Sequence, residues 1–205
     1  LDLNIKKIKT KSPKFYFDLG NIYKNFKEYD KSIKYFNLAL ETINKDSESY
    51  ADILYRRGGS YERIKNYEKA DIDLLLSLQL NPNQPYVLNY LAYSWLERKT
   101  KIDKSMEMLL KAYQQRKDDP YIIDSVGWAY YLTEDYETAE KYLKNALLIM
   151  PEDPIVNDHY GDVLWKLNMK LQAIYYWKAA LLSDEAEKKL KKDINEKLIF
   201  GLKNK

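Results

Sequence analysis

Apolar residues recur along most of the chain with the spacing of helices rather than of strands. In residues 123–130, Ile123, Val126, Gly127 and Tyr130 fall at i, i+3, i+4 and i+7, on one face of a helix. Polar turns such as Thr133-Glu134-Asp135 interrupt the pattern. They leave helical segments of roughly 13 residues, a common length in globular proteins. The pattern therefore predicts an all-α chain built from pairs of helices.

Small residues mark a repeat within this helical pattern. Glycine or alanine stands at Gly20, Gly58, Ala92, Gly127 and Gly161, at spacings of 38, 34, 35 and 34 residues. A second small residue follows twelve or thirteen positions later, at Ser32, Ala70, Ser105, Ala139 and Ala173. Small residues at both places allow the two helices of a pair to cross closely. We therefore expect five stacked helix pairs, each dependent on its neighbours for burial of its apolar face.

The fourth unit shows the fullest set of repeat residues. It contains Val126-Gly127, Tyr130, Ala139, Leu143, Ala146 and Pro151. This pattern resembles the tetratricopeptide repeat of 34 residues. The resemblance implies a right-handed α-solenoid of about five helix pairs. Its repeats are expected at 13–50, 51–84, 85–119, 120–153 and 154–183.

The two ends of the chain lie outside these repeats. Residues 1–12 are basic and are expected to be a linker or the remnant of an upstream repeat. In residues 184–205, Asp184 with Glu187 has the spacing of a capping box. Ala186, Leu190, Ile194 and Leu198 form an apolar stripe. These features predict a helix from Asp184 that caps the stack, although such a helix could also contact a membrane surface or a partner.

In tetratricopeptide proteins the first helix of each pair lines a concave binding surface. The resemblance therefore implies that positions 2, 5, 9 and 12 of each unit face a partner. The candidates at these positions are aromatic, amide and acidic. They are Tyr55, Tyr86, Asn89, Tyr93, Tyr121, Asp124, Trp128, Tyr131, Asp158, Asp162 and Trp165. The indoles Trp128 and Trp165 could instead pack between repeats.

Charge along the chain suggests the chemistry of the partner. The totals of 34 basic and 31 acidic residues nearly cancel, but residues 120–153 hold two basic and seven acidic side chains. We therefore expect a protein or peptide partner with a basic or apolar segment, and no nucleic acid. Some tetratricopeptide domains bind a terminal carboxylate through cations at positions 5 and 9. Those positions hold no cation here, so such a clamp is not expected.

Composition argues against catalysis. The chain has no cysteine and one histidine, which excludes a disulfide scaffold, a thiolate zinc site and a Cys–His nucleophile. Asp158 and Asp162 lie four residues apart beside His159, but two carboxylates without further ligands make a poor metal site. We therefore expect no catalytic residue, no metal and no cofactor. No run of 18 apolar residues is present, so no membrane-spanning helix is predicted.

Three stretches resemble the carboxyl-terminal repeats of a group of proteobacterial tetratricopeptide proteins. They are residues 88–95, 124–128 and 157–165. Members of that group include exported or lipid-anchored scaffolds, among them adaptors that bring substrates to a protease. The resemblance implies a non-catalytic scaffold, located in the bacterial envelope if a signal precedes Leu1 and in the cytoplasm otherwise. The alternatives are an assembly module that uses the convex face or stack ends, and the repeat region of a larger enzyme.

Overall fold

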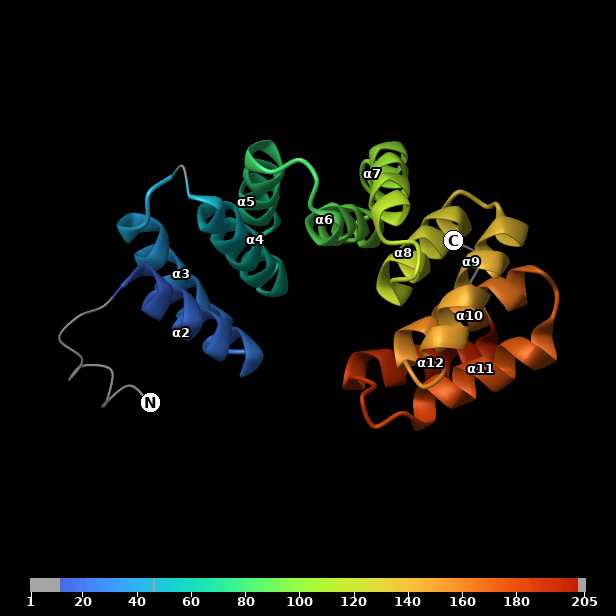
Figure 1. Cartoon of the computed structure of the whole chain (residues 1–205). Helices are drawn as coiled ribbons and strands as arrows, with labels where there is room; N and C mark the ends of the chain where they lie inside the picture. The colour runs from blue at the N-terminus through green and yellow to red at the C-terminus, as the bar shows by residue number, and fades with distance from the viewer. Residues whose placement is uncertain (1–11, 46, 203–205) are drawn as a thin grey trace. The chain divides into compact units, whose positions relative to one another are not determined.

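The computed structural model describes residues 12–45 and 47–202, and this part of the chain is all-α, as predicted. Eleven helices follow one another within these residues, without a strand (Figure 1). They are α2 (Pro13–Asn25), α3 (Tyr29–Thr42), α4 (Glu48–Arg63), α5 (Tyr67–Leu80), α6 (Pro85–Glu97), α7 (Ile102–Gln115), α8 (Pro120–Leu132), α9 (Tyr136–Ile149), α10 (Pro154–Lys166), α11 (Lys170–Leu182) and α12 (Lys188–Phe200). Residues 1–11, most of the expected linker or repeat remnant, lie outside the described residues.

The helices form two compact units, Leu1–Ser94 (unit 1) and Trp95–Lys205 (unit 2). In unit 1, α2 packs on α3, α3 on α4 and α4 on α5. In unit 2, each helix from α7 to α12 packs on the next. The first helices of neighbouring pairs also meet directly, α2 with α4 and α8 with α10. We call the side lined by these first helices the inner face of each unit.

Proline and a polar cap start several of the first helices. Pro13, Pro120 and Pro154 stand in the first turn of α2, α8 and α10, where a missing N–H has no consequence. The Asp119 carboxylate accepts hydrogen bonds from the backbone N–H groups of Tyr121 and Ile122 at 3.1 and 3.2 Å. Asp153 caps α10 in the same way. These caps define where the first helices of the fourth and fifth pairs begin.

The turn inside each helix pair contains one left-handed residue. Seven positions after each small residue of the first helix, φ is positive, at Lys27, Lys65, Lys99, Glu134 and Asn168. In the third pair a second left-handed residue, Lys101 with φ of 49°, follows two positions later. This turn lies between Ala92 and Ser105, the pair of small residues that is thirteen positions apart where the other four pairs are twelve apart, so it contains one inserted residue. The insertion is therefore absorbed in the turn rather than in a helix.

The small residues of the repeat face large buried side chains of the second helix. Phe36, Leu74, Leu109, Leu143 and Trp177 occupy one repeat position and are completely buried. A Cβ atom added at Gly127 would lie 2.7 Å from Cγ of Leu143 and 3.2 Å from its backbone nitrogen. The pair α8–α9 is therefore too close for a side chain at this position.

The capping helix begins later than the sequence predicts. The expected N-cap at Asp184 is wrong, because α12 starts at Lys188 and Asp184 lies in a turn. In that turn the Ser183 hydroxyl accepts the backbone N–H of Glu185 at 3.3 Å. The apolar stripe is buried as expected. Ile194 joins the core of α10 and α11, while Leu190 and Leu198 pack against it.

Candidate functional site

The candidate residues differ widely in exposure. Tyr121 on α8 and Tyr86 on α6 are 62% and 49% exposed. Six others are half-buried: Tyr55, Asn89, Tyr93, Trp128, Tyr131 and Trp165. The three carboxylates, Asp124, Asp158 and Asp162, are at most 7% exposed. The aromatic candidates therefore offer more surface than the acidic ones.

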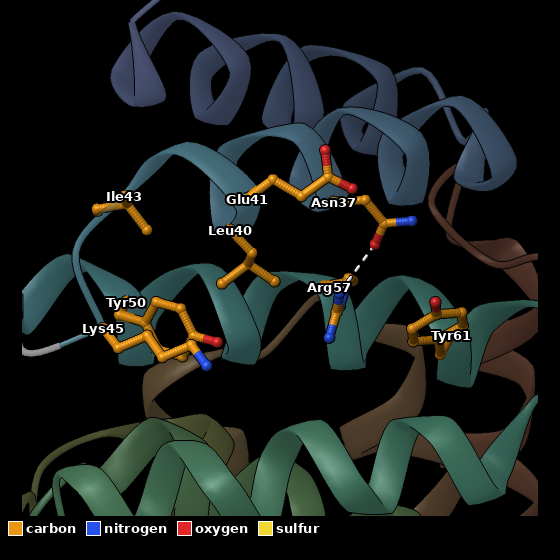
Figure 2. Close-up of a pocket in the computed structure, with 8 residues that line it drawn as sticks. All are labelled: Asn37, Leu40, Glu41, Ile43, Lys45, Tyr50, Arg57 and Tyr61. Atoms are coloured by element: carbon orange, nitrogen blue, oxygen red, sulfur yellow. Dashed lines mark hydrogen bonds between the residues drawn. The ribbon is translucent and has the colours of Figure 1, made fainter.

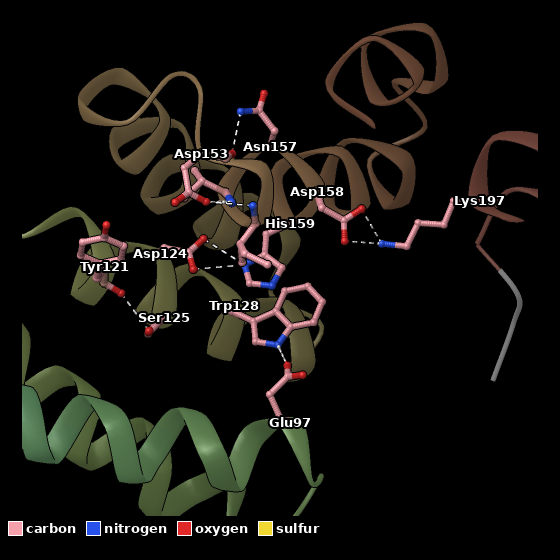
Figure 3. Close-up of polar contacts among 12 residues, drawn as sticks. Glu97, Tyr121, Asp124, Ser125, Trp128, Asp153, Asn157, Asp158, His159 and Lys197 are labelled. Atoms are coloured by element: carbon pink, nitrogen blue, oxygen red, sulfur yellow. Dashed lines mark hydrogen bonds and ion pairs between the residues drawn. The ribbon is translucent and has the colours of Figure 1, made fainter. Parts of the chain in front are cut away.

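Asp124 on α8 is paired with His159 on α10 (Figure 3). Nδ1 of His159 lies 2.9 and 3.1 Å from the two oxygens of the Asp124 carboxylate. Burial by itself lowers the pKa of His159. The charge and hydrogen bond of Asp124, with the charges of Asp158 and Glu97, outweigh burial and raise this pKa above its ordinary value. A buried ion pair therefore joins the first helices of the fourth and fifth pairs.

Trp128 lies in the middle of an aromatic stack on this inner face. Its indole is 4.6 Å from the Tyr131 ring and 4.0 Å from the His159 ring, with interplanar angles of 12° in both cases. Its Nε1–H donates to Oε1 of Glu97 at 3.1 Å (Figure 3). A charged imidazole stacked on an indole adds cation–π attraction. The indole is therefore fixed by its neighbours while part of it remains accessible.

Asp158 and Asp162 share the ammonium of Lys197 on α12. Nζ of Lys197 lies 2.7 Å from the nearest oxygen of each carboxylate. The indole N–H of Trp177 also donates to Asp162 at 2.8 Å. Burial, with the charge of Asp158, raises the pKa of Asp162 to about 6 although Lys197 opposes this shift. Burial by itself lowers the pKa of Lys197. The two carboxylates outweigh burial and raise this pKa above its ordinary value.

These pairs change the interpretation of the acidic candidates. The expectation of an open acidic surface is wrong for Asp124, Asp158 and Asp162, because His159 and Lys197 already bind them inside the chain. Lys197 lies 39 and 35 residues from its partners and was not among the candidates. The i, i+4 spacing of Asp158 and Asp162 could have pointed to a cation between them, but in the sequence it was interpreted only as a poor metal site.

Trp165 packs against the end of the chain rather than standing free. Its ring lies 5.2 Å from that of Trp177, and Nζ of Lys170 lies 5.2 Å from its centroid. Gly201, with φ of 70°, lies so close to the Trp165 ring that a Cβ atom would overlap it. Glycine fits here because it tolerates the left-handed backbone and has no Cβ atom to overlap the indole. Trp165 is largely a packing residue, the alternative that the sequence leaves open.

The inner face of unit 1 carries a second cluster, centred on Tyr55 of α4. The Tyr55 ring meets the Tyr90 ring edge-on at 5.9 Å, and the Tyr90 hydroxyl donates to Glu62 at 3.0 Å. Two cations lie over Tyr55: Nζ of Lys24 at 5.9 Å and the guanidinium of Arg56 at 5.2 Å. Burial, followed by repulsion from Arg56 and Arg63, lowers the pKa of Lys24 to about 8.

Unit 1 also contains an open cavity of about 540 Å³ between α3 and α4 (Figure 2). Arg57 lines it, but this guanidinium donates twice to Asp73 at 2.7 Å and once to Asn37 at 2.8 Å. The hydrogen-bonding capacity of Arg57 is largely used inside the chain, so this guanidinium is not a free cation in the cavity.

Two further kinds of site can be checked within the described residues. This part of the chain contains no group of three or more His, Cys, Asp or Glu side chains placed to hold a metal ion. None of its helices is both long and apolar enough to cross a membrane.

Comparison with known proteins indicates the family. A sequence profile described as tetratricopeptide repeat matches residues 13–46, 51–84 and 124–153. A TPR repeat-containing protein of Pseudomonas aeruginosa is 30% identical over 127 residues, which cover 60% of this chain and 21% of that protein. Human tetratricopeptide repeat protein 13 is 27% identical over 158 residues, 75% of this chain and 18% of that protein. The chain therefore spans about a fifth of the length of these relatives.

A solved structure shows the same fold. The crystal structure of a thermophilic TPR protein from Thermus thermophilus superimposes with a TM-score of 0.74 at 16% identity. The match covers 92% of this chain and 100% of that one. At this level of identity the likeness concerns the fold alone.

Proposed function

Since the chain belongs to the tetratricopeptide repeat proteins and is in general terms a protein-interaction module, we propose that it is a non-catalytic scaffold. In this proposal, the inner faces hold a peptide or a partner helix. The exposed and half-buried aromatic candidates anchor the partner, namely Tyr55, Tyr86, Tyr93, Tyr121, Trp128 and Tyr131. An adaptor role in a bacterial envelope complex is the specific form that the sequence resemblance favours.

The aromatic surface of unit 2 carries this proposal. Trp128 is held between Tyr131 and His159 and tethered to Glu97, so ordering it on binding costs little entropy. Tyr121 stands on the same helix, largely exposed. Rigid aromatic rings beside exposed ones are typical anchors for a bound chain. The buried ion pairs beside these rings keep the surface rigid and are themselves largely shielded from solvent.

Charge on unit 2 supports a basic or apolar partner segment. Four carboxylates, those of Glu97, Asp124, Asp158 and Asp162, surround the two cations His159 and Lys197. Negative charge therefore remains in excess. Burial, with the charges of Asp162 and Asp158, raises the pKa of the nearby Tyr131. A lysine or arginine side chain near Tyr131 would reduce this excess.

A matched pair of tyrosines tests the proposal. Tyr121 on the first helix α8 and Tyr175 on the second helix α11 are 62% and 67% exposed, so either change to alanine is expected to preserve the fold. Full-chain protein and each variant are used to capture partners from the source cell lysate, and the retained proteins are quantified by mass spectrometry. Tyr121→Ala should lose partners that Tyr175→Ala keeps. Equal retention by both variants contradicts binding at the inner face.

One observation favours the alternative, assembly through the convex side. Leu171, Tyr175 and Leu182 lie at i, i+4 and i+11 of α11 and are 67–84% exposed, which is an apolar stripe on a second helix. If Tyr175→Ala loses the partners and Tyr121→Ala keeps them, the convex face is the binding surface.

A further inference from the structure

We propose that the inner face of unit 1 contains a carboxylate-binding site, in which Lys24 and Arg56 over the Tyr55 ring take an aspartate or glutamate side chain of a partner. This inference rests on the proposed scaffold function and assigns an acidic partner segment to unit 1. The sequence predicts no carboxylate clamp, because positions 5 and 9 of the repeats hold no cation. Lys24 and Arg56 occupy positions 12 and 6, which that expectation did not consider.

Lys24 is a half-buried cation that forms no ion pair within residues 12–45 and 47–202. Among the described residues its ammonium makes a ring contact with Tyr55 at 5.9 Å and no hydrogen bond or ion pair. Nζ lies where a side chain of Gly59 would be, 2.9 Å from the place of its Cβ atom. The missing side chain at Gly59 thus leaves room for the ammonium on α4. Buried cations are normally paired, so an unpaired one indicates a missing anion.

Arg56 provides a second donor at the same ring. Its guanidinium lies 5.2 Å from the Tyr55 centroid, and its buried Nε–H has no hydrogen-bond acceptor within the described part of the chain. The Asp52 carboxylate is 3.6 Å from this nitrogen, an ion-pair distance that is too long for a hydrogen bond. Two donors from different helices, α2 and α4, therefore surround one aromatic ring without an acceptor.

The local charge balance favours an incoming anion of single charge. Three cations, Lys24, Arg56 and Arg63, face the two carboxylates Asp52 and Glu62. Glu62 is already used by the Tyr90 hydroxyl at 3.0 Å and by Arg63 at 3.7 Å. One carboxylate would balance the cluster and remove the repulsion that disfavours charged Lys24. A phosphate dianion would exceed the balance and approach Asp52 and Glu62, so the carboxylate is the better fit.

Peptide binding to the full chain tests the site. The probe is a fluorescein-labelled, carboxyl-amidated peptide that alternates glutamate with leucine and alanine. It is compared with the same peptide carrying glutamine in place of every glutamate. Anisotropy at low salt should show binding of the glutamate peptide only. Lys24→Gln should weaken it about tenfold, the effect of one charged hydrogen bond. Lys34→Gln, the same change at an exposed position on α3, should leave it unchanged.

A second measurement locates the carboxylate and controls for folding. NMR titration of the Lys24 side chain should give a pKa near 8 in the free protein and a higher pKa with saturating glutamate peptide. Circular dichroism should show that Lys24→Gln unfolds no earlier than the wild type, because it removes an unpaired, half-buried charge.

Several results overturn the proposal. They are equal binding of the glutamine peptide, no binding of the glutamate peptide, and equal weakening by Lys34→Gln and Lys24→Gln. Tighter binding of a phosphoserine peptide, or of a neutral peptide with a free carboxyl terminus, excludes a glutamate side chain as the ligand. If the glutamate peptide does not bind but Tyr121→Ala still loses partners, only the proposed site on unit 1 is excluded. Binding of the glutamate peptide when Tyr121→Ala loses nothing removes the proposed role of unit 2 instead.

Discussion

Replacing Lys197 with methionine tests the polar cluster that attaches α12 to α10. Methionine keeps most of the length and apolar character of the side chain but removes the ammonium bound by Asp158 and Asp162. The Lys197 side chain is 18% exposed, and those of its partners are 10% and 6% exposed. Removal of one member of a buried ion pair costs about 3–5 kcal/mol, because the remaining charge stays desolvated. We expect a loss in this range at pH 7.

The loss should shrink at lower pH. Burial already raises the pKa of Asp162 to about 6 in the presence of Lys197, and removal of the lysine raises it further. A carboxyl group with a raised pKa in the folded state favours folding most below its ordinary pKa of about 4, where it is neutral in both states. This contribution disappears as the pH rises through the folded-state pKa. The variant should therefore lie closest to the wild type near pH 4.

Urea unfolding followed by circular dichroism at several pH values measures both effects. Lys192→Met, on the exposed side of the same helix, is the control and should change the unfolding free energy by no more than about 0.5 kcal/mol. The reasoning is refuted if Lys197→Met and Lys192→Met lose the same amount at pH 7. It is also refuted if the loss in Lys197→Met is independent of pH.

Two further predictions concern the helix pairs of unit 2. Gly127→Leu should lower the unfolding free energy by about 1–3 kcal/mol, since even a Cβ atom would lie 2.7 Å from Cγ of Leu143; thermal unfolding at the wild-type melting temperature would contradict the close crossing. Asp124 raises the pKa of His159, so the pair stabilises the fold fully below the ordinary histidine pKa and progressively less as the pH rises through the raised one. Asp124→Asn should lower the pKa of His159 in an NMR titration and weaken this pH dependence, and an unchanged pKa would exclude the ion pair.

The repeat pattern predicted the helices because it depends on local chemistry. Proline with an aspartate cap starts α8 and α10, and small residues at Gly127 and Ala139 allow the close crossing of α8 and α9. The inserted residue of the third turn was also visible as a longer spacing. The start of α12 was predicted incorrectly, because Asp184 has the chemistry of a cap but Ser183 organises the turn.

The candidate residues on the inner faces show the limit of a position-based argument. Repeat position correctly indicates the helix that carries a side chain, and for Tyr121 it also agrees with high exposure. It does not indicate which charges are already paired. Asp158 and Asp162 have candidate positions, yet their partner is Lys197 on the capping helix. Among the described residues Lys24 has no ion-pair partner, which the charge totals of the sequence do not reveal.

The helical pattern, the repeat spacing and the burial of the repeated apolar positions follow from the sequence alone, because they depend on residues within a few turns of one another. The ion pairs of Asp124 with His159 and of Asp158 and Asp162 with Lys197 were decided only by the tertiary structure, since they join residues 35 to 39 positions apart. The strength of a charge depends on burial and on its nearest partners, and both are properties of packing. Tertiary structure therefore determines which charges on the inner faces remain available to a partner.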